Sequence, residues 1–136
     1  DSERNEVHYK GNILEVECRR RKDVCSLLMA WYRKRAEIKF EEYAVPLIAR
    51  FNRYQVKPSA IKLKEMATRW GSCTATGQIL LNPRLVCAPR ICIEYVIMHE
   101  LCHLVYRNHT KAFYELLTQE MPDWEKWKMK LEKLMI

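Results

Sequence analysis

Residues 99–109 read HELCHLVYRNH, and this short window holds three of the four histidines of the chain. On an α-helix each residue advances by about 100°, so His99 and His103 fall on one face, a single turn apart. The stretch from Tyr95 to Tyr106 is otherwise almost entirely apolar, which predicts a helix that is buried on most sides. Imidazoles and an ionised carboxylate are costly to bury without partners. A bound cation would serve as a partner for His99, Glu100 and His103 together.

The spacing of these three residues is the HExxH pattern. In that pattern two imidazoles on a helix hold zinc, and the glutamate between them is the general base for a bound water. With this number of histidines and glutamates, HExxH arises by chance roughly once in a hundred chains. The alternative is that hydrogen bonds within the core satisfy both histidines. We therefore expect His99 and His103 to be zinc ligands and Glu100 to be catalytic.

His109 is the third expected ligand. It follows the helical pair at the spacing of the HExxHxxGxxH pattern, but Tyr106 stands where that pattern has its glycine. The chain must then turn back in another way, and Asn108 tolerates left-handed backbone better than most residues. The alternative is that His109 is a surface histidine at a helix N-terminus, and that Glu115 or Glu120 completes the site.

Such a ligand set predicts hydrolytic chemistry. Three neutral imidazoles around one Zn²⁺ per chain leave an open position and lower the pKa of a bound water toward about 7. Glu100 would accept the proton as this water attacks a carbonyl, and would return it to the leaving amine. A second donor to the oxyanion is usual. By chemistry alone the candidates are Arg69, Tyr106 and His8, and each has a purely structural alternative.

The first part of the chain predicts a small β element followed by a long helical region. Residues 6–17 contain an alternating stretch around a glycine and are expected to form a strand or a short hairpin. From about Asp23 to Tyr54 apolar residues recur at helical spacing, and Asp23 can cap the start. Pro46 is expected to divide this region into two helices or to kink one.

Two strands are expected next, because residues 61–66 alternate apolar with polar and a second apolar run covers residues 78–82. Residues 69–77 carry small residues that suit a connection or a bulge. We therefore expect an antiparallel pair. An exposed strand edge can bind an extended peptide through main-chain hydrogen bonds.

The segment RWGSC, residues 69–73, would lie where this sheet meets the active site. Arg69 and Trp70 are thus candidate substrate-binding residues. The alternative is that Trp70 and Cys73 pack in the core while Gly71 makes a tight turn.

The remainder of the chain predicts helices. One begins near Pro89 and contains HELCH, another is capped by Thr110 or Asn108 and ends near Met121, and Pro122 opens the last one. The last helix has an apolar face formed by Trp124, Trp127, Leu131 and Leu134.

Composition limits the class of protein. A chain of 136 residues is expected to form a single domain over residues 1–136, and no apolar run approaches the roughly 18 residues of a membrane span. The net charge of +7 predicts either a partner with phosphates or acidic groups, nucleic acid included, or a solvated helix face. Six cysteines without a CxxC pair indicate reduced thiols in a cytoplasmic protein.

Several segments together resemble the YgjP-like metallopeptidases, a family of predicted metal-dependent hydrolases related to the SprT and WLM families. The matching segments are TRWGSC (68–73), GQILLNPRLVCAP (77–89), HELCH (99–103) and NHTKAFY (108–114). The resemblance covers roughly residues 24–136. It implies zinc on His99, His103 and His109 with Glu100 catalytic. It also implies a zincin-like α+β fold with helices around a small antiparallel sheet.

Members of that family usually carry more β-rich sequence at the N-terminus than residues 1–20 can supply, so we expect a catalytic-domain fragment or a shortened variant. The main functional hypothesis is a zinc-dependent peptidase that acts on peptides or proteins. One alternative is a metal-dependent hydrolase of a phosphate-containing small molecule such as a nucleotide. Another is a DNA-associated protease or a pure binding module, whose binding would weaken with salt.

Overall fold

The computed structural model describes the backbone of residues 6–10, 13–17 and 21–134, and the side chains from residue 27 onward except Met29, 135 and 136. At its centre lies α2 (Arg90–Val105), which contacts α1, α3, α4 and the strands β4 and β5. Pro89 precedes the helix and Tyr106 ends it with extended backbone. The expected buried helix that contains HELCH is therefore confirmed. Its buried residues are Cys92, Ile93, Tyr95, Val96, Ile97, Met98, Glu100, Leu101 and Cys102.

The long helical region is one helix, α1 (Arg21–Arg50), followed by the 3-10 helix η1 (Phe51–Tyr54). The prediction that Pro46 divides the region into two helices is wrong, because α1 continues through it. Pro46 and Glu42, whose carbonyl loses its helical hydrogen bond, are both exposed, so water can satisfy that carbonyl. The helix also begins at Arg21, which places Asp23 inside its first turn rather than at its cap.

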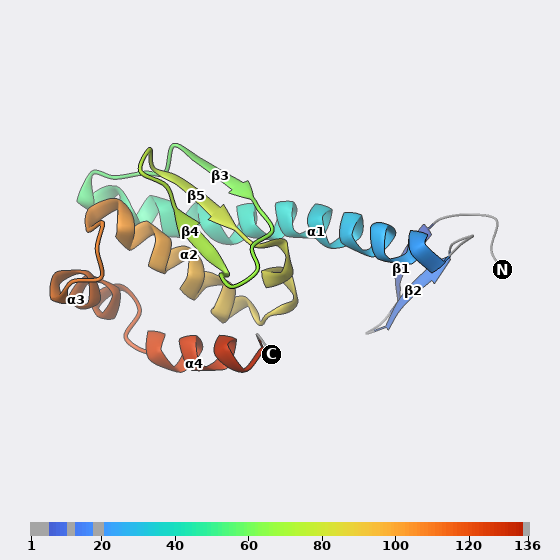
Figure 1. The fold of residues 1–136 in the computed structure, drawn as a ribbon. Helices are drawn as coiled ribbons and strands as arrows, with labels where there is room; N and C mark the ends of the chain where they lie inside the picture. The colour runs from blue at the N-terminus through green and yellow to red at the C-terminus, as the bar shows by residue number, and fades with distance from the viewer. Residues whose placement is uncertain (1–5, 11–12, 18–20, 135–136) are drawn as a thin grey trace.

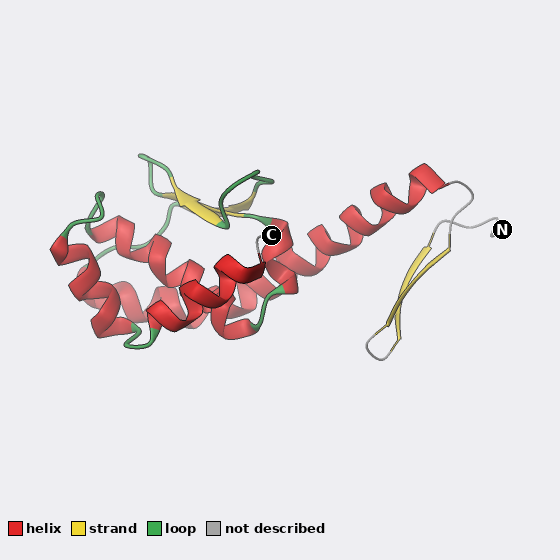
Figure 2. Cartoon of the chain, turned by 60° about the horizontal axis from the view of Figure 1, so that its bottom comes forward, coloured by secondary structure: helices red, strands yellow, loops and turns green. Residues whose placement is uncertain are grey.

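The central sheet has three strands, β3 (Ala60–Leu63), β4 (Gly71–Cys73) and β5 (Gln78–Leu81), in the order β3-β5-β4. β4 pairs with β5 antiparallel, whereas β3 pairs with β5 parallel. The expected antiparallel pairing of residues 61–66 with 78–82 is therefore wrong, and the sheet is mixed. The α+β class itself is confirmed. In Figure 2 the sheet lies on one side of the helices.

A buried asparagine explains why the chain makes this crossover. Asn82 follows β5, and its Nδ2 donates to the carbonyl oxygens of Met66, at 2.9 Å, and Arg69, at 3.0 Å. These bonds hold the segment after β3 over the end of β5, so residues 71–73 return along the opposite edge of that strand. The predicted connection at 69–77 thus contains a strand of its own.

The N-terminal strands β1 (Glu6–Lys10) and β2 (Ile13–Glu17) form an antiparallel hairpin, as the alternating pattern predicted. Figure 1 shows this hairpin near the start of α1, where the helix extends beyond the other elements. No helix in the described ranges combines the length and the apolar character that crossing a bilayer requires.

Two C-terminal helices complete the fold, α3 (Lys111–Glu120) and α4 (Trp124–Leu134). Thr110 caps α3 through its hydroxyl oxygen, which accepts from the backbone N–H of Phe113 at 3.3 Å. The expected apolar face of α4 packs on the core except at its end, where Leu134 is 49% exposed.

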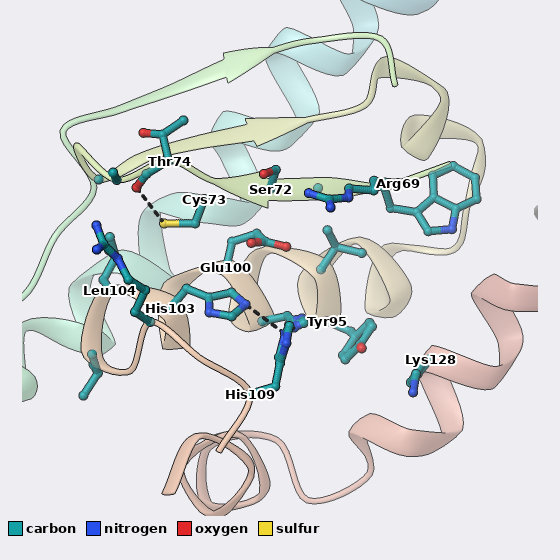
Figure 3. A pocket seen from close by; sticks show the side chains of 18 of the residues that line it. Arg69, Ser72, Cys73, Thr74, Tyr95, Glu100, His103, Leu104, His109 and Lys128 are labelled. Atoms are coloured by element: carbon teal, nitrogen blue, oxygen red, sulfur yellow. Dashed lines mark hydrogen bonds between the residues drawn. The ribbon is translucent and has the colours of Figure 1, made fainter. Parts of the chain in front are cut away.

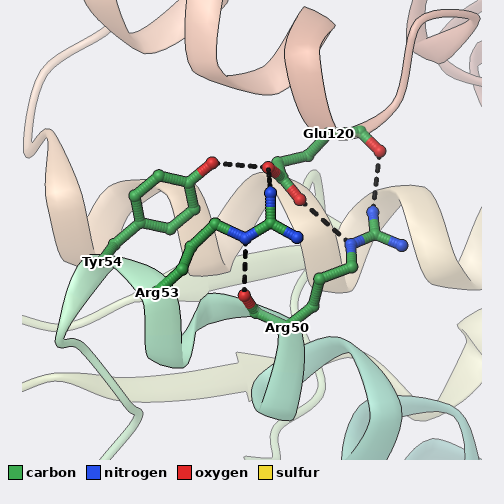
Figure 4. A network of polar contacts seen from close by, with 4 residues as sticks. All are labelled: Arg50, Arg53, Tyr54 and Glu120. Carbon is green, nitrogen blue, oxygen red and sulfur yellow. Dashed lines mark hydrogen bonds and ion pairs between the residues drawn. The ribbon is translucent and has the colours of Figure 1, made fainter.

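Glu120 joins the end of α3 to the end of α1 (Figure 4). Its side chain is only 3% exposed. Arg50 donates from Nε to the carboxylate at 3.0 Å and from Nη2 to the Glu120 carbonyl at 2.7 Å. Tyr54 donates its hydroxyl to the same carboxylate at 2.5 Å, and Arg53 adds an ion pair at 3.5 Å. This network fixes α3, the helix that directly follows His109.

Candidate metal centre and active-site cleft

The three histidines of HELCHLVYRNH meet at one point. α2 presents His99 and His103 one turn apart, and the loop after α2 brings His109 back toward them. The Nε2 of His109 lies 3.1 Å from the Nε2 of His99 and 3.1 Å from the Nε2 of His103. Ligand atoms of all three residues lie within 4.8 Å of one another. Figure 3 shows the His103 and His109 rings pointing toward each other beneath Glu100.

This arrangement fits a metal ion better than mutual hydrogen bonding. Two nitrogens that bind zinc tetrahedrally at about 2.0–2.1 Å stand about 3.3 Å apart, close to the spacings seen here. The Nδ1 of His103 lies 3.2 Å from the carbonyl oxygen of Tyr106. Because a carbonyl oxygen can only accept, this Nδ1 carries the hydrogen, and the lone pair remains on Nε2, which points into the cluster.

Electrostatics favour the neutral, metal-binding form of these rings. Burial lowers the pKa of His99 to about 3, and the nearby charges of His103, His109 and Lys128 act in the same direction. Burial also lowers the pKa of His103, although its backbone hydrogen bond to Tyr106 opposes that effect. Neutral imidazole is the form that coordinates a metal.

The turn after α2 is made without left-handed backbone at Asn108. Gln55 is the one non-glycine residue with positive φ in the described ranges, so the role expected of Asn108 is wrong. Tyr106 ends the helix with φ −127° and ψ 112°. The N–H of Thr110 then donates to the Asn108 carbonyl at 2.8 Å. An extended residue followed by a tight turn replaces the glycine of the familiar pattern.

Neither carboxylate proposed as a substitute for His109 lies in the cluster. Glu120 is bound to α1 as described above. Glu115 is 67% exposed and pairs with Lys111 at 3.9 Å. Cys102 between the helical histidines is fully buried, and burial raises its pKa to about 12, so its thiol is a packing group.

Glu100 is held beside the cluster by close packing between α2 and β4. It is 6% exposed. A Cβ built at Gly71 would lie 3.2 Å from Oε2 of Glu100 and 2.8 Å from Cγ1 of Val96, so only glycine permits this approach. Burial raises the pKa of Glu100 to about 7, while the positive charge of Arg69 acts in the opposite direction. A carboxyl with that pKa can both accept and donate a proton near neutrality.

The histidines and Glu100 line a cleft with a volume of about 880 Å³. Residues 69–77 form one wall, α2 forms the floor, and the last turns of α4 contribute Lys128, Leu131 and Glu132. β4 is an edge strand of the sheet, so among the described strands none lies beside its other edge. Arg69 and Trp70 line the cleft, as the RWGSC motif predicted.

Two other candidate residues lie elsewhere. The Tyr106 side chain is 39% exposed and is not among the residues that line the cleft, although the Tyr106 carbonyl orients His103. His8 belongs to β1, which lies near the first turns of α1 (Figure 1).

The sequence analysis did not single out several lining residues, among them Tyr95, Arg107 and Lys128. Tyr95 precedes His99 by one helical turn and stacks on its ring with centroids 6.0 Å apart, so the helical period could have identified it. The other two are charged residues in a loop and on an amphipathic helix. In the sequence, charged residues at such positions look the same whether they line a cleft or face solvent.

Comparison with known proteins agrees with this geometry. The family model described as YgjP-like, metallopeptidase domain, matches residues 2–134. No curated protein matches the sequence. The structure is similar to the crystal structure of the zymogen of the metallopeptidase jannalysin from Methanocaldococcus jannaschii. That match has 20% identity and a TM-score of 0.61, and covers 71% of this chain and 97% of that one.

A second similar structure is the zymogen of the metallopeptidase abylysin from Pyrococcus abyssi, with 14% identity and a TM-score of 0.56. That match covers 72% of this chain and 92% of the other. At these identities the two likenesses establish a shared fold.

Proposed function

This chain belongs to the YgjP-like metallopeptidase family, and on that premise we propose that it cleaves peptide bonds with zinc held by His99, His103 and His109 and with Glu100 as general base. The protein is a metal-dependent peptidase, and the nucleotide-hydrolase and DNA-associated alternatives are not favoured. Residues 1–136 act as one catalytic domain in this proposal. The observation that carries it is the convergence of three imidazole nitrogens beside a buried glutamate.

The donor set supports zinc as the metal. Three neutral imidazole nitrogens suit a borderline-soft dication and leave one coordination position for water or substrate. A bound zinc ion supplies Lewis-acid chemistry, since it makes water more acidic and polarises a carbonyl. The hydrogen bond from His103 to the Tyr106 carbonyl keeps that ring in the correct tautomer and orientation.

Glu100 is suited to move the proton. Its carboxyl is buried between β4 and the histidines. It accepts a proton from the attacking water and donates it to the leaving amine. Arg69, whose positive charge acts on Glu100, extends along β4 in Figure 3 and is the candidate to stabilise the oxyanion.

The edge of β4 supports binding of an extended substrate. A peptide that adds to this edge forms main-chain hydrogen bonds that do not depend on its side chains. Its scissile bond then passes between Glu100 and the histidines, and Arg69 and Trp70 contact its side chains.

The four cysteines in the described part of the chain are free, which favours a reducing compartment such as the cytoplasm.

Metal analysis and hydrolysis test this function together. We expect about one zinc ion per chain in the wild type, loss of zinc in His103→Ala and in His109→Ala, and cleavage of casein by the zinc-loaded wild type. Glu100→Gln should keep its zinc and lose roughly 100-fold or more of its activity. A wild type that binds no zinc, or a Glu100→Gln variant with full activity, would contradict the proposal.

A further inference from the structure

Three cations line the active-site cleft, and each comes from a different segment. Arg69 precedes β4, Arg107 lies in the loop after α2, and Lys128 lies on α4. No carboxylate in the described part of the chain pairs with either guanidinium. Lys128 has one weak partner, Glu132 at 3.9 Å. Two carboxylates, Glu100 and Glu132, also line the cleft, so the three cations exceed the lining carboxylates by one.

The three charges act at different places in the cleft. In Figure 3, Arg69 lies on the β4 wall above Glu100, and Lys128 lies on α4, on the far side of Tyr95 from the histidines. Arg107 acts on Cys73, the last residue of β4, where burial raises the thiol pKa and the arginine opposes it. All three side chains thus direct charge at the space that a substrate would fill.

The positions of these cations follow from the way β4 lies on α2. Gly71 packs against Val96, and Gly77 lies beside Leu104, with its Cβ position 3.8 Å from Cδ2. β4 and the turn after it therefore run in the same direction as α2. Figure 3 shows Arg69 and Lys128 at the end of the cleft away from Leu104, whereas Arg107 follows Leu104 closely in the sequence. The zinc ligands lie between them.

We propose that this peptidase selects acidic peptides, with one carboxylate bound by Arg107 on one side of the scissile bond and another bound by Lys128 on the other side. This inference rests on the proposed peptidase function. A peptide extended along β4 places alternate side chains on the same face, so either chain direction brings one carboxylate to each end. Charge-assisted hydrogen bonds from arginine are among the strongest in proteins.

The test is a set of fluorogenic peptides of equal length with amidated C-termini. Glu, Gln or Lys is placed in turn at each of the nearest positions before and after the scissile bond. For the zinc-loaded wild type we expect kcat/KM to be roughly tenfold higher with Glu than with Gln on each side, and lowest with Lys. A further pair of Gln peptides ends shortly after the scissile bond, one with a free C-terminal carboxylate and one with an amide. Faster cleavage of the free acid would show that a chain terminus supplies the bound carboxylate.

Charge reversal assigns the cations. Arg107→Glu should abolish the Glu preference on one side of the bond, and Lys128→Glu should weaken it on the other, each shifting that side toward Lys. Arg107→Gln is a milder variant in case the reversal disturbs folding. Lys133→Glu is the matched control, because it makes the same charge change on an exposed part of α4 outside the cleft.

The outcomes separate this inference from the function on which it depends. Equal cleavage of Glu and Gln peptides, or a preference for Lys, would overturn the selection of acidic substrates and leave the peptidase function intact. Failure of the zinc-loaded protein to cleave any peptide would overturn both. If Arg107→Glu instead loses affinity for single-stranded DNA while its peptide preference is unchanged, the cations serve nucleic acid and the inference is wrong.

Discussion

Gly71 of β4 and Glu100 of α2 are in direct contact, so close that a methyl group at Gly71 would lie 3.2 Å from the glutamate oxygen. This contact leaves no room for a side chain at Gly71 between β4 and α2. It also excludes water from one side of the carboxylate. The burial that raises the pKa of Glu100 to about 7 therefore depends on a glycine in another segment of the chain.

Gly71→Ala should lower both stability and activity. The new methyl group would lie 2.8 Å from Val96 Cγ1, and overpacking of this kind costs about 1–3 kcal/mol. Displacement of Glu100 should lower kcat/KM by at least about tenfold. Urea unfolding and peptide hydrolysis measure the two effects. In a Val96→Ala background the nearest atom is gone, so the stability cost should shrink; an unchanged cost would show that the clash is not the cause.

Zinc should stabilise the wild type through the histidine cluster. At a free zinc concentration about 100 times the Kd, a ligand that binds only the folded state adds about 2.7 kcal/mol, which raises the thermal midpoint by several degrees. Glu100→Gln should respond like the wild type because it keeps all three imidazoles. His109→Ala should respond far less. An equal shift in His109→Ala would mean that zinc binds elsewhere.

Glu120→Ala should destabilise the fold by about 2–3 kcal/mol, because the carboxylate is buried and accepts hydrogen bonds from Arg50 and Tyr54. Glu115→Ala on the same helix is the control. Its exposed pair with Lys111 should contribute less than about 0.5 kcal/mol. Chemical denaturation compares the two, and equal effects would show that the Glu120 network adds nothing beyond an ordinary surface ion pair.

Thr110→Ala should cost about 1 kcal/mol, since it removes the cap of α3 and leaves the Phe113 N–H without its side-chain acceptor. Thr110→Ser keeps a hydroxyl and should retain most of the stability. Because Thr110 directly follows His109, the alanine variant should also bind zinc more weakly, as competition with a chromogenic chelator would measure. Identical zinc affinities in the two variants would refute a link between the cap and the ligand.

The sequence predicted the local elements well where a strong period or a cap was present. The helix of HELCH is apolar on most sides, so its burial follows from composition alone. Thr110 stands at a position where its hydroxyl can reach the third residue of α3, and the alternating stretch at 6–17 forms the expected hairpin. The candidate ligands came from spacing, because residues four apart share a helix face whatever surrounds them.

Local sequence patterns do not predict which strands pair or in which direction. The period of two in residues 60–63 identifies a strand but carries no information about direction, so the parallel pairing with β5 was missed. The side-chain bonds of Asn82 to Met66 and Arg69 decide that crossover. Pro46 predicts a break or a kink, because proline removes a helical hydrogen bond. Ala44 and Leu47, on either side of it, are buried in the core. Their tertiary packing keeps α1 continuous, and a rule based on neighbouring residues alone does not include that packing.

The sequence alone therefore determined the α+β class, the buried helix and the residues offered as zinc ligands, because these depend on backbone periods and on side-chain chemistry close along the chain. Only the tertiary structure decided that β4 lies against Glu100, that His109 turns back without a glycine, and that Arg69, Arg107 and Lys128 surround one cleft. The physical reason is that packing, burial and electrostatic coupling join residues far apart in sequence, whose separation in space no local pattern encodes.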